Sequence, residues 1–145
     1  MVHILPIQKF KLFSEQHNGQ FLFVSNDMEG PDHVVEAHPF ANEERNFFRA
    51  LDEPDGRVRL LHPLTNTFVF VSNDLAGTDR IVEAHTSSNE ERNKFEVKPQ
   101  GDGSFTFFNT FTERFLFLSN DKRGNDFVIE AHKRIELRNR FRVKL

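Results

Sequence analysis

Cysteine, tryptophan and tyrosine are absent from the 145 residues of this chain, and no long hydrophobic run is present. Without cysteine, the chain cannot be a small scaffold held together by disulfides. No apolar stretch approaches the roughly 20 residues of a membrane-spanning helix, so we expect no membrane insertion. Segment 1–7 is too short and too interrupted for a signal peptide. We therefore expect a cytoplasmic protein, or one exported without a conventional signal peptide.

An excess of charge of one sign is also missing, because the formal net charge is only −3 and acidic and basic residues are interleaved. Nucleic acids and anionic membrane surfaces reward a concentrated positive face, so neither is an expected partner. A chain of this length normally forms one domain and buries about 70% of its unfolded surface, which makes a stabilising metal or disulfide unnecessary. We expect a single domain over residues 1–145.

What the chain does contain is a signature that occurs three times, at a spacing of 47 residues. An internal period of this length predicts a repeat architecture, in which any site is built in triplicate. The repeats cover residues 9–56, 57–103 and 104–145. Within them, Ser-Asn-Asp occupies 25–27, 72–74 and 119–121, and Glu-Ala-His occupies 36–38, 83–85 and 130–132.

Each repeat shows four short segments with the period-two alternation that is typical of strands. In the first repeat these are 10–13, 21–24, 34–38 and a segment centred on 47–48. Asn18-Gly19, between the first two segments, is a strong hairpin signal. No segment keeps a helical period over three turns. The sequence therefore predicts an all-β protein of twelve short strands.

The order Gly-Gln-Phe-Leu-Phe-Val at 19–24, a loop, Val35 and Ala37, about ten polar residues and then Phe48 carries a family resemblance. The whole chain resembles the β-trefoil superfamily and is similar to the repeat unit of fibroblast growth factors, fascins, hisactophilin and ricin-B-type lectins. The resemblance implies a six-strand barrel capped by three hairpins around a pseudo-threefold axis. It specifies the fold and not the function, because this fold carries very different activities.

The chain departs from each well-known branch of that superfamily. Ricin-type lectins carry a Gln-x-Trp signature, and this chain has no Trp. The basic heparin-binding strip of the growth factors is not apparent, and the seven histidines are few beside hisactophilin. Fascins join several trefoils, whereas this chain has the length of one. The resemblance therefore identifies no close branch.

Strand alternation sorts the repeated positions into two faces. Leu22, Val24, Val35 and Ala37 take core positions, which leaves an aromatic ring, a carboxylate and an imidazole on the outward face of each repeat. A Ser-Asn-Asp loop lies at the tip. Sugars stack on flat apolar rings and exchange hydrogen bonds with planar polar groups. The candidate ligand-binding residues are therefore Phe23, Asn26, Asp27, Asp32, Glu36, His38, Phe70, Asn73, Asp74, Asp79, Glu83, His85, Phe117, Asn120, Asp121, Asp126, Glu130 and His132.

Plainer interpretations of the same residues stay open. The Phe rings can belong to a lower core, with Glu36 and His38 only solvating an outer face. The loop containing Asp27, Gly30 and Asp32 could hold Ca²⁺, but its ligand order is not that of an EF-hand, and these residue types also suit a tight turn. Outward histidines on three hairpins should diverge, so no zinc centre is expected. We expect no metal and no cofactor.

The acidic segment 43–46 and its copies at 90–93 and 136–139 precede the fourth strand of each repeat. We interpret this segment as architecture. Asn46 should satisfy backbone groups in a bend, while Arg45 pairs with a neighbouring Glu.

No catalytic signature is present: there is no cysteine nucleophile, no Gly-x-Ser-x-Gly elbow and no glycine-rich phosphate loop. Three equivalent surfaces favour binding over catalysis. We therefore expect a non-catalytic, multivalent binding module, lectin-like, with up to three equivalent sites for a carbohydrate or glycoconjugate. The alternative is a protein-interaction trefoil, cytoskeletal or inhibitory, in which exposed Phe contacts a protein partner or forms a homodimer. A growth-factor-like ligand would require a basic patch and ranks last.

Overall fold

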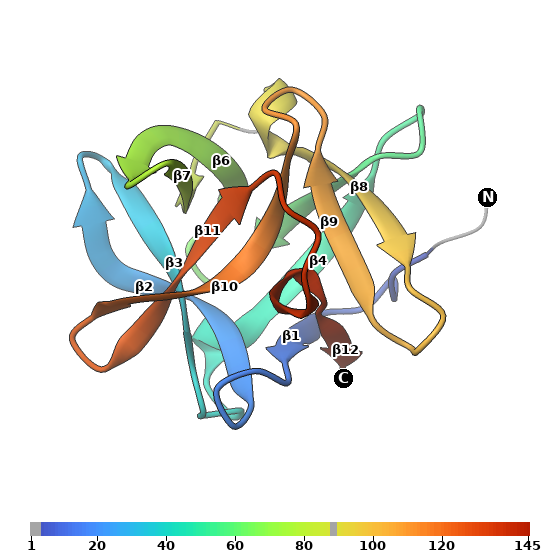
Figure 1. Ribbon diagram of the computed structural model, residues 1–145. Coiled ribbons are helices and arrows are strands. Elements are labelled where there is room, and N and C mark those ends of the chain that lie inside the picture. The colour runs from blue at the N-terminus through green and yellow to red at the C-terminus, as the bar shows by residue number, and fades with distance from the viewer. Residues whose placement is uncertain (1–3, 88–89) are drawn as a thin grey trace.

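The computed structural model describes residues 4–87 and 90–145, and nearly all of its regular elements are strands (Figure 1). The predicted all-β class is confirmed, with one strand–helix order repeated three times. The strands are β1 (Phe10–Ser14), β2 (Gln20–Glu29), β3 (Asp32–His38), β4 (Phe47–Asp52), β5 (Val58–His62), β6 (Thr67–Ala76), β7 (Asp79–His85), β8 (Lys94–Pro99), β9 (Phe105–Asn109), β10 (Arg114–Arg123), β11 (Asp126–His132) and β12 (Arg142–Lys144). Short 3-10 helices precede β4, β8 and β12: η1 (Glu44–Asn46), η2 (Glu91–Asn93) and η3 (Leu137–Asn139).

Strands β1, β4, β5, β8, β9 and β12, two from each repeat, form a closed barrel. Antiparallel pairs run from β12 to β1, and onward through β4, β5 and β8 to β9. Phe105 and Phe141 close the ring, because each backbone N–H donates to the carbonyl of the other, at 2.8 and 2.9 Å. The main apolar core is continuous with this barrel and contains Phe10, Phe48 and Phe107.

The other strands form the hairpins β2–β3, β6–β7 and β10–β11, which gather at one end of the barrel (Figure 1). Their inner strands β3, β7 and β11 pair with one another around the pseudo-threefold axis. A barrel capped by three such hairpins is the predicted β-trefoil, which is therefore confirmed. Val34, Ile81 and Val128 meet in a small second apolar cluster. Strand alternation places Val34 on the face opposite Val35, yet Val34 is fully buried, because β3 lies between β7 and β11 and this cluster covers its second face.

The Ser-Asn-Asp segments were predicted to be loops at the hairpin tips. This prediction is wrong, because the segments are parts of long strands. Strand β2 continues to Glu29, and its register with β3 shifts between Val24 and Met28, which marks a β-bulge. The Ser25 side-chain oxygen accepts the backbone N–H of Asp27 at 3.0 Å inside this bulge. The tip itself turns at Gly30, whose φ of +61° suits glycine. Asn26 and Asp27 are exposed along the edge of the hairpin.

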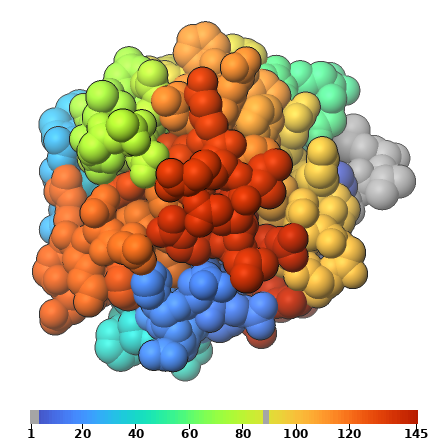
Figure 2. Space-filling view, in the orientation of Figure 1, coloured from blue at the N-terminus to red at the C-terminus, as the bar shows by residue number. Residues whose placement is uncertain are grey.

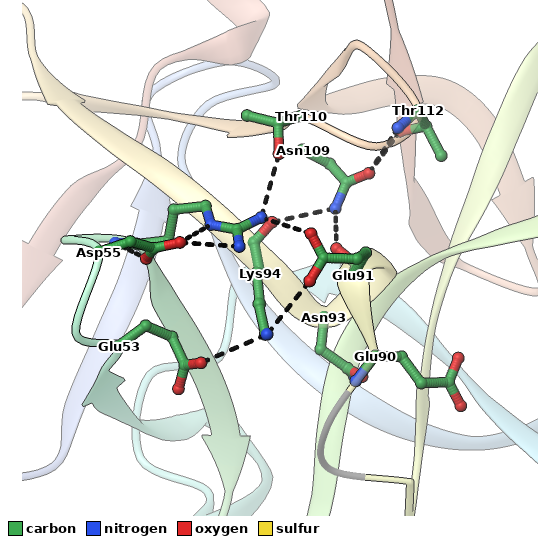
Figure 3. Close-up of polar contacts among 10 residues, drawn as sticks. Glu53, Asp55, Glu90, Glu91, Asn93, Lys94, Asn109, Thr110 and Thr112 are labelled. Carbon is green, nitrogen blue, oxygen red and sulfur yellow. Dashed lines mark hydrogen bonds and ion pairs between the residues drawn. The ribbon is translucent and has the colours of Figure 1, made fainter.

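A polar network joins the second and third repeats around η2 (Figure 3). The guanidinium of Arg57 donates to Asp55 at 2.8 Å, to Glu91 at 2.9 Å and to the Thr110 hydroxyl at 3.2 Å. Lys94 extends the network to Glu53, the residue that directly follows β4, at 3.4 Å. Arg57 is largely shielded from solvent, so it contributes to holding β5, η2 and the end of β9 together.

Candidate functional site

The predicted stacking rings are part of the fold. Phe23, Phe70 and Phe117 are only 1–2% exposed, so the expectation that they face solvent is wrong. In the first repeat the imidazole of His38 lies flat on Phe23, with ring centroids 3.9 Å apart, and the guanidinium of Arg45 lies 4.9 Å from the same ring. The other two repeats have the same arrangement. A ring covered in this way cannot stack on a sugar.

The imidazole of His38 is held by Asn46, which is fully buried at the end of η1. The Asn46 side-chain oxygen accepts the backbone N–H of Glu43, so its Nδ2 faces the other way. That Nδ2 donates to the Leu22 carbonyl at 3.1 Å and to His38 Nε2 at 3.2 Å. The ring proton of His38 therefore lies on Nδ1. These contacts confirm the interpretation of the 43–46 segment as architecture.

This Phe–His–Asn cluster recurs in all three repeats, and its histidines are neutral where a pKa shift is resolved. Burial lowers the pKa of His38 and of His132 below the ordinary value. His38 and His132 are buried, and His85 is half-buried. The expectation of outward-facing imidazoles is wrong for His38 and His132, because the hairpin packs on both of its faces. His38 and His132 are each 3% exposed, so they offer little ring surface to a ligand. The clusters consist of Phe23, His38 and Asn46; Phe70, His85 and Asn93; Phe117, His132 and Asn139.

The three repeated glutamates are also buried, each 1% exposed, so the prediction that they present carboxylates to a ligand is wrong. Burial, followed by a hydrogen bond with Asp27, raises the pKa of Glu36 to about 8. Burial and Asp74 raise the pKa of Glu83 to about 9, and burial and Asp121 raise that of Glu130 to about 8. These side chains are therefore protonated at neutral pH. They are neutral parts of the cap rather than anionic ligand contacts.

The repeated polar residues meet in a different place, in a cleft between the first and third repeats. We call it the first cleft, and its volume is about 630 Å³. One wall carries His38, with Phe40 61% exposed and its ring nearly perpendicular to this imidazole, at 5.3 Å between the ring centroids. The facing wall is the tip of the β10–β11 hairpin. The complete lining is Asp27, His38, Phe40, Glu43, Arg45, Arg123, Gly124, Asn125 and Asp126.

Another cavity is built in the same way between the third and second repeats. We call it the third cleft, because the third repeat supplies its histidine, and its volume is about 240 Å³. His132 stands where the first cleft has His38, and Asp79 stands where it has Asp126. In Figure 2 the green tip of the β6–β7 hairpin lies against the red segment that follows β11. Its lining is Thr78, Asp79, Arg114, His132, Lys133 and Arg134.

At the remaining equivalent position, Asp32 of the first hairpin acts on Glu83 of the second repeat, where its charge contributes to the raised pKa of Glu83. His85 lies on the same strand as Glu83. Ser87 occupies the place that Phe40 has in the first repeat, and the neighbouring residues 88–89 lie outside the described part of the chain. The threefold pattern therefore places an Asp and a His on facing repeats each time.

The predicted site residues thus divide into four groups, one of which is the half-buried pair Asp32 and His85 described above. Asp27, His38 and Asp126 line the first cleft, and Asp79 and His132 line the third. The Phe and Glu residues are buried. A last group is exposed beside the hairpins, outside the linings of these two clefts: Asn26, Asn73, Asp74, Asn120 and Asp121.

Phe40, Arg45 and Arg123 were not predicted as lining residues. Phe40 has no aromatic counterpart in the other repeats, so a search for repeated residues could not find it. The sequence feature that marks Phe40 is its lack of repetition: it is a lone aromatic residue in an otherwise polar stretch.

Within residues 4–87 and 90–145, no group of three or more His, Asp or Glu side chains is arranged to hold a metal ion. No helix in the same part of the chain has the length and apolar character needed to span a membrane.

Solved structures share this fold, although no protein-family model matches the chain and no curated protein matches it in sequence. The designed threefold-symmetric protein ThreeFoil has a TM-score of 0.81 and 17% identity, over 94% of this chain and 98% of that one. A Caenorhabditis elegans protein of unknown function has a TM-score of 0.83 and 15% identity, over 94% of this chain and 93% of that one. A Polyporus squamosus lectin, bound to the epitope Neu5Aca2-6Galb1-4GlcNAc, has a TM-score of 0.78 and 14% sequence identity. The match covers 99% of this chain and 51% of the lectin. At such identities the likeness establishes the fold alone.

Proposed function

We propose that this chain is a non-catalytic, multivalent module that binds carbohydrate in the clefts between its repeats. The observation that carries the proposal is the first cleft, where the exposed ring of Phe40 stands beside the edge of His38 and faces Asn125 and Asp126. A sugar has an apolar face for such a ring and hydroxyl groups for amides and carboxylates. Aromatic surface flanked by a few fixed polar groups is the usual composition of a small-ligand site.

The recurrence of the cleft supports binding rather than catalysis. A single small domain seldom needs an active site in several copies, whereas weak binding sites at fixed spacing gain avidity from repetition. The fold supports the same role, because the Polyporus squamosus lectin carries its sugar epitope on a protein that shares this fold.

A glycan array probed with three proteins tests the proposal. The wild type should bind a defined set of glycans, and Phe40→Ala should lose at least about tenfold in affinity for the ligand of the first cleft, since one stacked ring contributes about 0.5–1.5 kcal/mol beyond its buried area. Phe111→Ala is the matched control, because Phe111 is 65% exposed and lies outside both cleft linings. A wild-type protein that binds no glycan, or equal binding by the wild type and Phe40→Ala, would refute the proposal.

A protein-interaction role is the second candidate, carried by different residues from those first predicted. Phe23 and its copies are buried and cannot form an interface, but Phe111 and Leu64 are exposed at equivalent turns between β9 and β10 and between β5 and β6. Exposed apolar side chains mark a contact surface where a partner covers them together. Light scattering separates the candidates: a stable dimer that Phe111→Ala dissociates, together with a negative array, would favour the interaction role.

A further inference from the structure

The clefts share a frame but differ at three positions around their rim. We call the shared part the frame: it is the histidine of one repeat and the aspartate of the neighbouring hairpin, His38 with Asp126 in the first cleft and His132 with Asp79 in the third. The three variable positions are the residue that begins the second strand of the repeat and the two residues that follow its histidine. The third repeat has Arg114, Lys133 and Arg134 at these positions, and all three line the third cleft. The first repeat has Gln20, Pro39 and Phe40, of which Phe40 lines the first cleft, and the second repeat has Thr67, Thr86 and Ser87.

The substitutions reverse the charge balance of the linings. In the lining of the third cleft, Arg114, Lys133 and Arg134 outnumber the carboxylate of Asp79, and the balance stays positive when Glu136, the ion-pair partner of Arg134, is counted. In the first cleft, two arginines stand against three carboxylates. A concave site with an excess of one charge concentrates ligands of the opposite charge, because the low-dielectric walls focus the field. The third cleft is therefore electrostatically complementary to an anion, and the first is not.

The cations of the third cleft keep donors available for a ligand. Arg114 Nη1 donates to the Thr112 carbonyl at 3.1 Å, while its Nε is buried without an acceptor in the described structure. Arg134 Nε pairs with Glu136 at 2.8 Å and its Nη2 lies 3.3 Å from His132 Nδ1, but the side chain is 66% exposed. Lys133 is exposed. A guanidinium has five N–H groups, so one carboxylate partner leaves others for a second acceptor.

We propose that the third cleft selects an acidic sugar, one that carries a carboxylate or sulfate group, whereas the first cleft selects a neutral one. This inference rests on the proposed carbohydrate binding. Arg134 and Lys133 hold the anionic substituent, since guanidinium groups recognise carboxylate and sulfate oxygens with paired, charge-assisted hydrogen bonds. Asp79 and the edge of His132 face the hydroxyl groups. One molecule would thus display two sugar specificities on a single duplicated frame.

Amide chemical shifts of ¹⁵N-labelled protein test this directly. The probes are glucuronic acid with glucose, galacturonic acid with galactose, and inorganic sulfate. The acidic member of at least one pair should shift the amides of Thr78, Asp79 and Arg134 at a concentration at least tenfold lower than its neutral partner. Lys133→Thr with Arg134→Ser, which installs the residue types found at the aligned positions 86 and 87, should abolish that preference and leave the shifts at Phe40 unchanged. Arg49→Ser with Lys98→Thr removes the same charge elsewhere and should change nothing.

Each outcome separates the two proposals. Equal response of the third cleft to acidic and neutral sugars, or a preference that survives in the double variant, overturns the inference while carbohydrate binding stands. Inorganic sulfate that shifts these amides as strongly as the acidic sugar overturns it too, because the cleft would then bind simple anions. Shifts in neither cleft with any sugar, together with a negative glycan array, overturn the proposed function itself.

Discussion

The imidazole of His132 lies flat on the ring of Phe117, with ring centroids 3.6 Å apart and an angle of 6° between the planes. The same pair occurs in the other two repeats. It joins the outer strand of each hairpin to the inner strand, and Asn139 ties this pair to the 3-10 helix. The residues that recur most strictly are therefore those that hold the cap together, and the residues that recur least define the rims of the clefts.

Removing the buried ring should destabilise the fold severely. Phe117→Ala deletes a fully buried side chain and the stacking partner of His132, so we expect the free energy of unfolding to fall by about 3–5 kcal/mol. Urea denaturation measures the change. Phe40→Ala, which deletes an exposed ring, should stay within about 0.5 kcal/mol of the wild type. A loss below about 1 kcal/mol in Phe117→Ala would contradict the structural role of the ring.

Asn46, which positions the imidazole of His38, should also contribute strongly to the stability of the fold. Asn46→Ala leaves the Leu22 carbonyl and the Glu43 N–H without their partner in a buried place, and we expect a loss of about 2–4 kcal/mol. The exposed Asn42 is the control, and its replacement by Ala should cost almost nothing. Equal stability of the two variants would show that the buried amide is dispensable.

The buried glutamates should make the protein less stable as pH rises from 7 to 9. Their pKa values are raised in the folded state, to about 9 for Glu83, so the folded chain binds more protons than the unfolded chain above the ordinary glutamate pKa. Stability then falls with rising pH, by up to about 1.4 kcal/mol per pH unit for each carboxyl, until the folded pKa is passed. The buried histidines do not oppose this trend, because above about pH 6.5 they are neutral in both states.

Thermal unfolding of Glu83→Gln tests that linkage. The variant keeps a neutral side chain of the same shape, so its melting temperature should fall less between pH 7 and pH 9 than that of the wild type. Glu96→Gln, at an exposed position on β8, should follow the wild type. Identical pH profiles for the wild type and Glu83→Gln would show that Glu83 is ionised in the folded protein at neutral pH.

The network around Arg57 should contribute to stability in a salt-dependent way. Arg57→Ser removes the guanidinium that joins Asp55, Glu91 and Thr110 (Figure 3), and we expect a loss of about 1–2 kcal/mol at low ionic strength. The loss should shrink in 1 M salt, since screening weakens ion pairs that are partly exposed. The exposed Arg49, replaced by Ser, serves as the control. A loss that does not change with salt would assign the role of Arg57 to packing instead.

The fold was predictable because period and alternation are local properties of the sequence. Leu22, Val24, Val35 and Ala37 were assigned to the core, and all four are buried. The opposite face was misassigned, because alternation distinguishes two faces of a strand without saying what covers each one. Phe23 on that face is covered by its own imidazole neighbour and by Arg45, which arrives from a 3-10 helix.

The clefts were harder to predict, for a related reason. Asp126 faces the His38 edge only because β11 pairs with β3, and this pairing joins residues about 90 positions apart. Comparison within one repeat places Asp126 beside its own histidine instead. Once the pairing is known, the rim residues follow directly from the aligned repeats, where Phe40, Ser87 and Arg134 share one position.

The most direct test of the account is an amide-shift titration of the ¹⁵N-labelled protein with the strongest glycan ligand from the array. We predict that saturable shifts concentrate at Phe40, Arg45, Gly124 and Asn125, on the two walls of the first cleft, or at the equivalent positions of the third. Shifts centred on Phe111 and Leu64, or on the exposed edges of the hairpins away from both clefts, would contradict the claim that the repeats bind sugar between them.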